Sequence, residues 1–109
     1  MTSVQCDIGL IGLAVMGENL ALNIESRGFR VAVHNRSASR TQAFLAGRAL
    51  GRRITGADTL FDFVAALAKP RRILLMVQAG PAVDTLIEAL APLLDAGDIL
   101  VDGGNSLYT

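Results

Sequence analysis

The sequence predicts an α/β domain built on a doubly wound parallel sheet, with helices covering both faces. Short apolar segments typical of strands alternate along the chain with segments of helical periodicity. The strand segments are apolar at nearly every position, as in parallel strands that are covered on both sides. The 109 residues suffice for one such domain, and no low-complexity linker or internal repeat divides the chain.

Five strand segments stand out by their apolar and β-branched residues. They lie at 6–13, 29–34, 73–77 and 99–101, with a very short edge strand around Ile54 in the loop 51–56. Parallel neighbours need crossover connections, and these are expected to be right-handed.

The gaps between these strands carry helical patterns with recognisable ends. The first helix has apolar residues four positions apart and is expected to stop at Gly28. The other helices are expected to begin at Ser37 or Ser39, at Asp58 or Thr59, and at Pro81. The third should end near Lys69, because Pro70 disfavours helix in the residue before it, and Pro92 should interrupt the fourth.

The composition excludes several functional classes. One cysteine and one histidine leave no basis for an internal disulfide, a cysteine-based metal site or a histidine cluster, so no metal is expected. No apolar run approaches the roughly 18–20 residues that span a bilayer, and the N-terminus lacks a secretory signal. A cytoplasmic protein without membrane contact is therefore expected. A net charge of zero and 5% aromatic residues argue against nucleic-acid binding.

The basic residues are concentrated in one segment. Residues 27–57 contain no acid and carry Arg27, Arg30, Arg36, Arg40, Arg48, Arg52 and Arg53. For most of these arginines the simpler interpretation is a solvated helix face. The alternative is a site for an anionic small molecule, because the forked guanidinium group suits phosphate.

A glycine-rich motif joins the first strand to the first helix and supports that alternative. Its residues are Gly12, Leu13, Ala14, Val15, Met16 and Gly17, which read G-x-A-x-x-G, close to the dinucleotide-binding pattern G-x-G-x-x-G. Gly12 permits a tight turn, Ala14 lets the backbone approach a pyrophosphate, and Gly17 allows close helix packing. The N–H groups at the helix start would bind the phosphates. Strand, motif and helix together predict a Rossmann-type nucleotide site.

The end of the second strand discriminates between nicotinamide cofactors. An NAD site usually carries an acid here that binds the ribose 2′-hydroxyl, but the residues are His34, Asn35, Arg36 and Ser37. Arg36 would attract a 2′-phosphate and stack on the adenine, Ser37 would donate a hydrogen bond, and His34 would lie near the adenine. The sequence therefore predicts NADP rather than NAD, with the arginine-rich segment at the 2′-phosphate end. In the simpler alternative, Arg36 merely covers a helix end.

Two further loops follow strands at the same expected edge of the sheet. Val77, Gln78 and Ala79 follow the third long strand, and 102–105 follows the last. Asn105 offers both a donor and an acceptor to a nicotinamide carboxamide or a substrate hydroxyl. The alternative is a Gly-Gly turn in which Asn105 bonds its own backbone.

Together, four segments closely resemble the decarboxylating 6-phosphogluconate dehydrogenase family of the β-hydroxyacid dehydrogenase superfamily. They are residues 12–20, 35–37, 69–72 and 102–106. The resemblance implies a cytoplasmic homodimer that oxidises 6-phosphogluconate at C3 with NADP, then releases CO₂ to give ribulose 5-phosphate.

The resemblance also implies roles for individual residues. Residues 12–17 would line the pyrophosphate, and Asn35, Arg36 and Ser37 would hold the 2′-phosphate end. Val77, Gln78 and Ala79 would flank the cofactor, and Asn105 would meet both cofactor and substrate. Gln78 departs from the family, whose members often carry lysine at this position.

The catalytic lysine and glutamate of the family, and its helical dimerisation domain, belong to later segments. Lys69 precedes a strand at the end far from the ligand. We therefore expect an incomplete N-terminal portion of the coenzyme domain, with an exposed edge strand, no catalytic residue and no turnover by itself. The alternatives are a stand-alone dinucleotide-binding module and an NAD-dependent β-hydroxyacid dehydrogenase.

Overall fold

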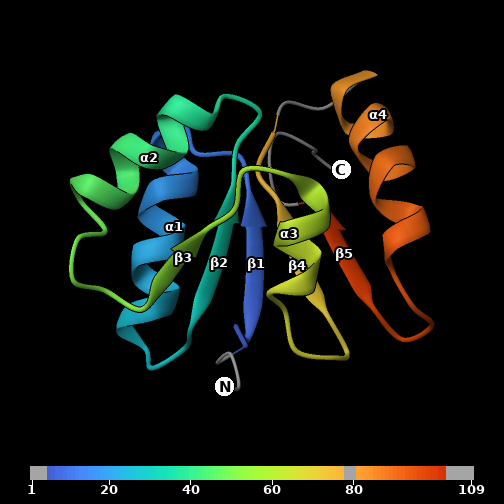
Figure 1. Cartoon of the computed structure of the whole chain (residues 1–109), viewed down its shortest axis with the longest axis horizontal. Coiled ribbons are helices and arrows are strands. Elements are labelled where there is room, and N and C mark those ends of the chain that lie inside the picture. Colours follow the sequence, from blue (N-terminus) through green and yellow to red (C-terminus); the bar gives the residue numbers. More distant parts are fainter. Residues whose placement is uncertain (1–4, 78–80, 103–109) are drawn as a thin grey trace.

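A computed structural model describes residues 5–77 and 81–102 and shows one parallel five-stranded sheet in the order β3-β2-β1-β4-β5 (Figure 1). The strands are β1 (Ile8–Ile11), β2 (Val31–His34), β3 (Ile54–Gly56), β4 (Arg72–Leu75) and β5 (Ile99–Asp102). The helices are α1 (Val15–Ser26), α2 (Ala38–Ala46), α3 (Leu60–Ala65) and α4 (Pro81–Leu90), with a 3₁₀ turn over Ala91–Leu93. The predicted α/β class and parallel sheet are confirmed.

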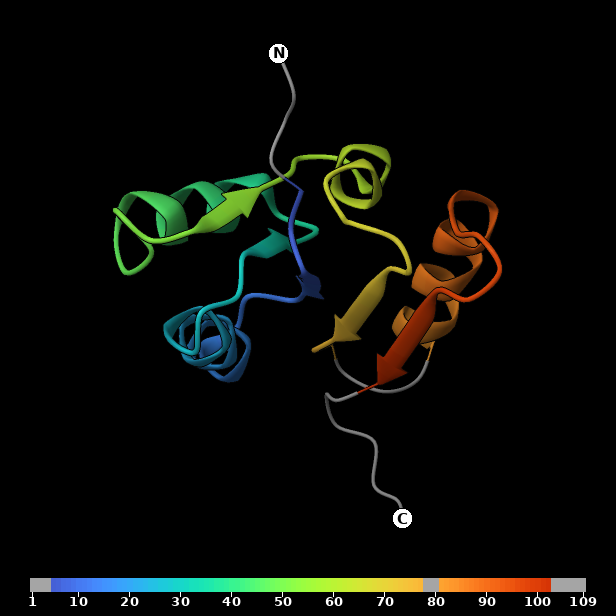
Figure 2. The ribbon, with the colours of Figure 1, turned by 90° about the horizontal axis from the view of Figure 1, so that it is seen from below.

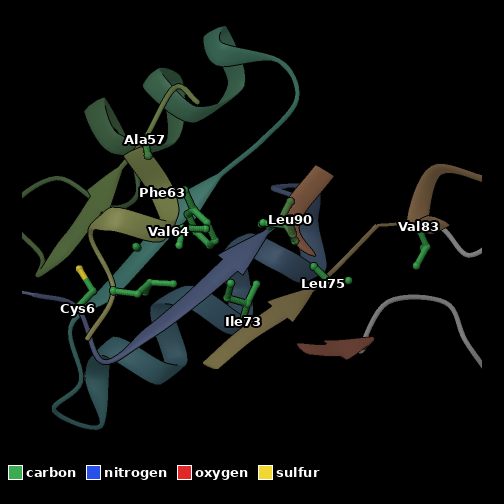
Figure 3. Packing of buried hydrophobic residues seen from close by; sticks show 11 residues of the cluster. Cys6, Ala57, Phe63, Val64, Ile73, Leu75, Val83 and Leu90 are labelled. Atoms are coloured by element: carbon green, nitrogen blue, oxygen red, sulfur yellow. The ribbon is translucent and has the colours of Figure 1, made fainter. Parts of the chain in front are cut away.

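A separate apolar core lies on each face of the sheet. Leu10, Val31 and Val33 point to the side where Ala21 of α1 and Phe44 of α2 pack. The other face meets α3 and α4, and Figure 3 shows Phe63 and Val64 of α3 in that cluster. Figure 2 shows α1 on one side of the sheet and α3 and α4 on the other. Covering on both sides explains why the strands are apolar without alternation.

The structure shifts several expected boundaries. β1 ends at Ile11 because Gly12 turns the chain at a φ of +108°. The short edge strand expected around Ile54 is present as β3. α3 ends at Ala65, well before Lys69, because the backbone beyond it pairs with Cys6 instead. Cys6 N donates to Ala66 O at 2.7 Å, and Ala68 N donates to Cys6 O at 2.9 Å.

The expected helix ends are confirmed in part. Thr59 caps α3, its hydroxyl accepting from Asp62 N at 3.1 Å. Pro92 lies in the 3₁₀ turn that follows α4, so the predicted interruption is present. Ser37 occupies the N-cap position of α2, but its hydroxyl bonds that of Ser39 rather than a backbone N–H. The expected start of α2 at Ser37 is therefore confirmed, but the serine side chain does not cap the helix.

Three of the seven arginines in residues 27–57 attach the segment between α2 and β3 to α1. The Glu25 side chain is only 10% exposed and pairs with Arg52 at 2.9 Å and with Arg53 at 3.3 Å. Arg48 pairs with Glu18 in the first turn of α1 at 2.9 Å. These acids come from the arginine-free start of the chain, so the segregated charges meet in the folded domain.

β5 forms one edge of the sheet. Ile99 and Val101 are 49% and 50% exposed, and both are large apolar residues. Leu100, between them, packs partly against the core under α4. The expected exposed edge strand is therefore present among the described residues.

The buried carboxylate of Glu25 makes the stability of the domain depend on pH. The backbone N–H of Arg53, then the guanidinium groups of Arg52 and Arg53, lower the pKa of Glu25 below its ordinary value of 4.5. A depressed carboxyl pKa stabilises the folded state above the unfolded-state value, and this stabilisation is lost as pH falls through the folded-state value.

We therefore expect Glu25→Gln to lower the melting temperature at neutral pH, because the glutamine cannot replace the charge-assisted bonds. The difference from the unsubstituted chain should shrink as the pH falls below 4.5. Thermal denaturation followed by circular dichroism over this pH range checks it. The control is Glu88→Gln at an exposed position of α4, and an equal loss in both variants at neutral pH would contradict the prediction.

Candidate nucleotide-binding site

The glycine-rich motif lies at the carboxyl edge of the sheet, where the strand order reverses. From β1 the chain winds outward to β2 and β3, then returns to β4 on the other side of β1. Ligands of open α/β sheets bind in the crevice outside the carboxyl ends at such a point. In Figure 1 the chain leaves the upper end of β1 and crosses at that edge of the sheet to the upper end of α1, on the left of the view.

Two glycines bring the start of α1 against the end of β1. A Cβ on Gly17 would lie 1.9 Å from Gly12 O, and one on Gly12 would lie 2.3 Å from Met76 O. Neither position admits a side chain, and Gly12 also has a φ of +108°, which favours glycine. The roles expected for these glycines, a tight turn and close helix packing, match this geometry.

The start of α1 exposes backbone donors. Ala14 occupies the N-cap position, in extended backbone, and provides no side-chain cap to the helix. The first N–H groups of an uncapped helix lack intrahelical acceptors, and with the helix dipole they favour an anion. Val15 and Met16 are 69% and 68% exposed, so solvent reaches this turn. The motif therefore has the features that a pyrophosphate requires.

Asn35, expected at the 2′-phosphate end, is bound to the motif itself. Its Oδ1 accepts from Leu13 N at 2.8 Å, and its Nδ2 donates to Ser37 O at 3.4 Å. Its side chain thus joins the loop after β2 to the glycine-rich loop.

Arg36 and Ser37 lie exposed beyond β2. Within the described part of the chain, Arg36 forms no ion pair, unlike Arg48, Arg52 and Arg53. Its guanidinium is consequently available to an anion from solution. The two residues are placed at the carboxyl edge, beside the motif, as the sequence suggested.

His34 has a structural role instead of lying open beside a nucleotide. Its side chain is 8% exposed and its Nδ1 lies 2.9 Å from Ala57 O. Its ring packs against Phe63, with centroids 6.1 Å apart. His34 and Ala32 lie on the same face of β2, so the ring of His34 enters the core under α3.

A cavity of about 630 Å³ lies between α1 and α2, next to Ser37. Glu18, Ser39, Arg40 and Arg48 contribute its polar lining. Arg40 Nη1 donates to Leu13 O at 3.2 Å, a contact that the sequence did not suggest. Arg48, Arg52 and Arg53 pair with acids of α1, whereas the expected place of the arginine-rich segment at the 2′-phosphate end stays a prediction.

The other expected site residues divide into described and undescribed positions. Val77 is half-buried against the α3–α4 core, while Gln78, Ala79 and Asn105 lie outside the described residues.

Lys69 precedes β4, at the amino edge of the sheet, and pairs with Asp95 at 2.6 Å. Hydrogen bonding and charge from Lys69 lower the pKa of Asp95. Lys69 is thus far from the glycine-rich loop, as predicted.

The part of the chain that the structure describes shows neither a metal-ligand cluster of histidine, cysteine or acidic residues nor a helix that could cross a bilayer.

The strand order, the glycine turn and the uncapped helix define a Rossmann-type dinucleotide-binding domain. A family model for the NAD-binding domain of 6-phosphogluconate dehydrogenase matches residues 7–109. The chain belongs to this family.

Curated relatives carry the same family name at high identity. The chain is 63% identical over 101 residues to a decarboxylating 6-phosphogluconate dehydrogenase of Synechococcus elongatus, covering 93% of this chain and 21% of the relative. It is 57% identical over 104 residues to the human enzyme, covering 95% and 22% respectively. The chain thus spans about a fifth of the length of these relatives.

Solved structures support the fold. A Plasmodium falciparum 6-phosphogluconate dehydrogenase, studied without ligand, with NADP+ and with 6-phosphogluconate, superposes with a TM-score of 0.84 at 45% identity. That match covers 94% of this chain and 22% of the other. A diketoreductase, at 19% identity and a TM-score of 0.74, shares the fold.

The contact between Gly17 and Gly12 predicts an unusual sign for a helical substitution. Glycine to alanine inside a free helix is stabilising by about 1 kcal/mol. Here the added methyl would meet Gly12 O at 1.9 Å. We expect Gly17→Ala to lower the free energy of unfolding by roughly 1–3 kcal/mol, as overpacking does.

Urea denaturation measures this loss. The control is Gly47→Ala after α2, where φ is −107° and the nearest atom to an added Cβ is 3.1 Å away, so the loss should be smaller. A Gly17→Ala variant as stable as the unsubstituted chain would contradict the close packing of α1 on the turn.

Proposed function

We propose that this chain is the NADP-binding portion of a dehydrogenase that converts 6-phosphogluconate to ribulose 5-phosphate and CO₂. The observation that carries the proposal is the presence, at one edge of the sheet, of an uncapped helix start and of exposed Arg36, which forms no ion pair with a described acid. The first suits a pyrophosphate and the second suits a 2′-phosphate. The solved relative that binds NADP+ and 6-phosphogluconate adds support.

The residues present fit the cofactor. Gly12 and Gly17 let the start of α1 lie against the end of β1, and the uncapped N–H groups of that helix start would bind a diphosphate. Arg36 and Ser37 would hold the 2′-phosphate, and Val77, Gln78 and Ala79 would flank the cofactor. When bound, the nicotinamide ring accepts a hydride from the substrate alcohol. Asn105 would orient the carboxamide and a substrate hydroxyl.

We further propose that catalysis requires groups outside these residues. Among the described residues, His34 is buried and Lys69 lies at the opposite edge of the sheet, so neither is placed to act as a general base. The lysine and glutamate expected of the family would be supplied by the remainder of a longer protein, together with its homodimer contacts. The soluble, cytoplasmic setting expected of the family belongs to the same proposal.

Arg36 tests the choice of cofactor. Arg36→Asp replaces a phosphate-binding cation by a repelling anion, and charge-assisted bonds contribute about 1.5–3 kcal/mol. We expect NADPH affinity to fall at least about tenfold, while NADH affinity changes by less than about threefold. Isothermal titration calorimetry with both cofactors measures the difference.

The matched control is Arg72→Asp, which makes the same charge change on an exposed residue at the amino end of β4. It should leave both affinities unchanged. If Arg36→Asp weakened NADPH and NADH equally, the assignment of the 2′-phosphate to Arg36 would fail. An NAD-dependent relative or an NAD-binding module would show no preference for NADPH in the unsubstituted chain.

A further inference from the structure

The part of the sheet formed by β4 and β5 is covered on one face only among the described residues. Ile73 and Leu100, which pair across the two strands, point to the face where α3 and α4 pack. Leu74 and Val101, the next pair, point to the opposite face, because side chains alternate along a strand. Figure 2 shows α4 beside β4 and β5, on the side of the sheet opposite α1. No described helix lies over Val101, which is half exposed.

This second face is apolar and open. Ile99 and Val101 of β5 are half exposed, and Leu74 and Met76 are only partly covered by the core under α1. A groove of about 300 Å³, lined in part by Leu20 of α1, borders this face at Met76. We call Leu74, Met76, Ile99 and Val101 the open β4–β5 face. Parallel strands are normally covered on both faces, and contiguous exposed apolar side chains mark an interaction site.

One cation stands at the amino end of the open β4–β5 face. Arg72 pairs in register with Ile99, so the two side chains share this face. Arg72 is exposed and forms no ion pair with a described acid, whereas its neighbour Arg71 pairs with Asp95 and Asp98. Covering an unpaired charge is costly. A segment that covers this face therefore needs apolar side chains over Ile99 and a carboxylate near Arg72.

The length of the relatives indicates the source of such a segment. The chain is 63% identical to the Synechococcus elongatus relative but spans 21% of its length, and it superposes on 22% of the Plasmodium falciparum enzyme. Most of each of those polypeptides thus lies outside the part that this chain matches. A covering segment in the same polypeptide has an effective concentration of about millimolar, which a second molecule does not reach at ordinary concentrations.

We propose that the open β4–β5 face is the docking surface for a helical segment of the longer protein that lies beyond these 109 residues. Its apolar side chains cover Ile99 and Val101, and one of its carboxylates pairs with Arg72. A helix is the expected cover, because helices form the layers on both faces of parallel sheets. This inference rests on the longer dehydrogenase proposed above, and it concerns a surface that takes no part in the nucleotide site.

Cysteine labelling measures whether the face is covered. Val101→Cys is made in this chain and in a longer protein that joins residues 1–109 to the remainder of the Synechococcus elongatus relative. We expect N-ethylmaleimide to react with the new thiol at least about tenfold more slowly in the longer protein. Native Cys6 does not compete, because it is buried, and burial raises the pKa of its thiol. Unlabelled Cys6 also shows that the domain is folded in both proteins.

Thr85→Cys is the matched control, at an exposed position of α4 on the other side of the sheet. Its labelling rates in the two proteins should agree within about twofold. Equal rates for Val101→Cys in the two proteins, or an equal slowing of Thr85→Cys, would overturn the proposal. Protection of Val101→Cys that grows with the concentration of the 109-residue chain would make a second copy the occupant, and would overturn it too.

Arg72 tests the carboxylate of the covering segment. Adding Arg72→Glu to Val101→Cys places two acids together in the longer protein, so labelling there should accelerate roughly three- to tenfold, the loss of about one charge-assisted contact. The same pair of substitutions should change the rate in the 109-residue chain less than about twofold. Arg72→Lys, which keeps the cation, should retain most of the protection. An equal change in both proteins would refute the carboxylate.

The labelling experiments use no nucleotide, so they fail independently of the proposed function. NADPH binding by the 109-residue chain, with an unprotected Val101→Cys thiol in the longer protein, would refute the docking surface alone. A protected thiol in a protein that does not bind NADPH would refute the proposed function and preserve the docking surface.

Discussion

The site depends on the contact between the start of α1 and the carbonyl of Gly12. A methyl group at Gly17 would lie 1.9 Å from that oxygen, so only glycine allows the helix to begin so close to the end of β1. This closeness places uncapped backbone donors at the carboxyl edge, between β1 and the neighbouring β4. The anion site is therefore a property of the backbone, made possible by two missing side chains.

Five arginines of residues 27–57 divide into those that pair with acids of α1 and those that do not. Arg48, Arg52 and Arg53 meet acids of α1 and attach α2 and β3 to it. Arg40 reaches a backbone carbonyl of the glycine-rich loop, and Arg36 remains exposed. The attachment of β3 to α1 is charge-assisted and partly buried, which makes it more valuable than an exposed surface pair.

Much of the fold was predictable because its signals are local. Apolar runs identified the strands, and the spacing of Gly12 and Gly17 identified the turn that the structure confirms. The partners of Glu25 were not predictable, since an ion pair between residues 27 positions apart depends on how two elements pack. The surroundings of His34 were also not predictable, because strand alternation alone does not say which of the two covered faces its side chain enters.

The same limit applied to the candidate site. Arg36 was distinguished by its place after β2, where residue type bears directly on the cofactor. The sequence showed Arg40 only as one member of a basic segment. Its contact with Leu13 O depends on how α2 is positioned relative to the glycine-rich loop. The early end of α3 has a similar cause, because pairing with Cys6 overrides an apolar helical pattern that runs on to Leu67.

Arg48, Arg52 and Arg53 pair with acids of α1 and so stabilise the fold. They are not the arginine that we propose to select the cofactor. The cations that hold the domain together are a different set from the exposed arginine after β2. A lineage could exchange that arginine for an acid, and change the nucleotide it favours, without loosening the attachment of β3 to α1. In the proposed site, an exchange at Arg36 alone would change the preferred cofactor, while the charges that maintain the fold stay constant.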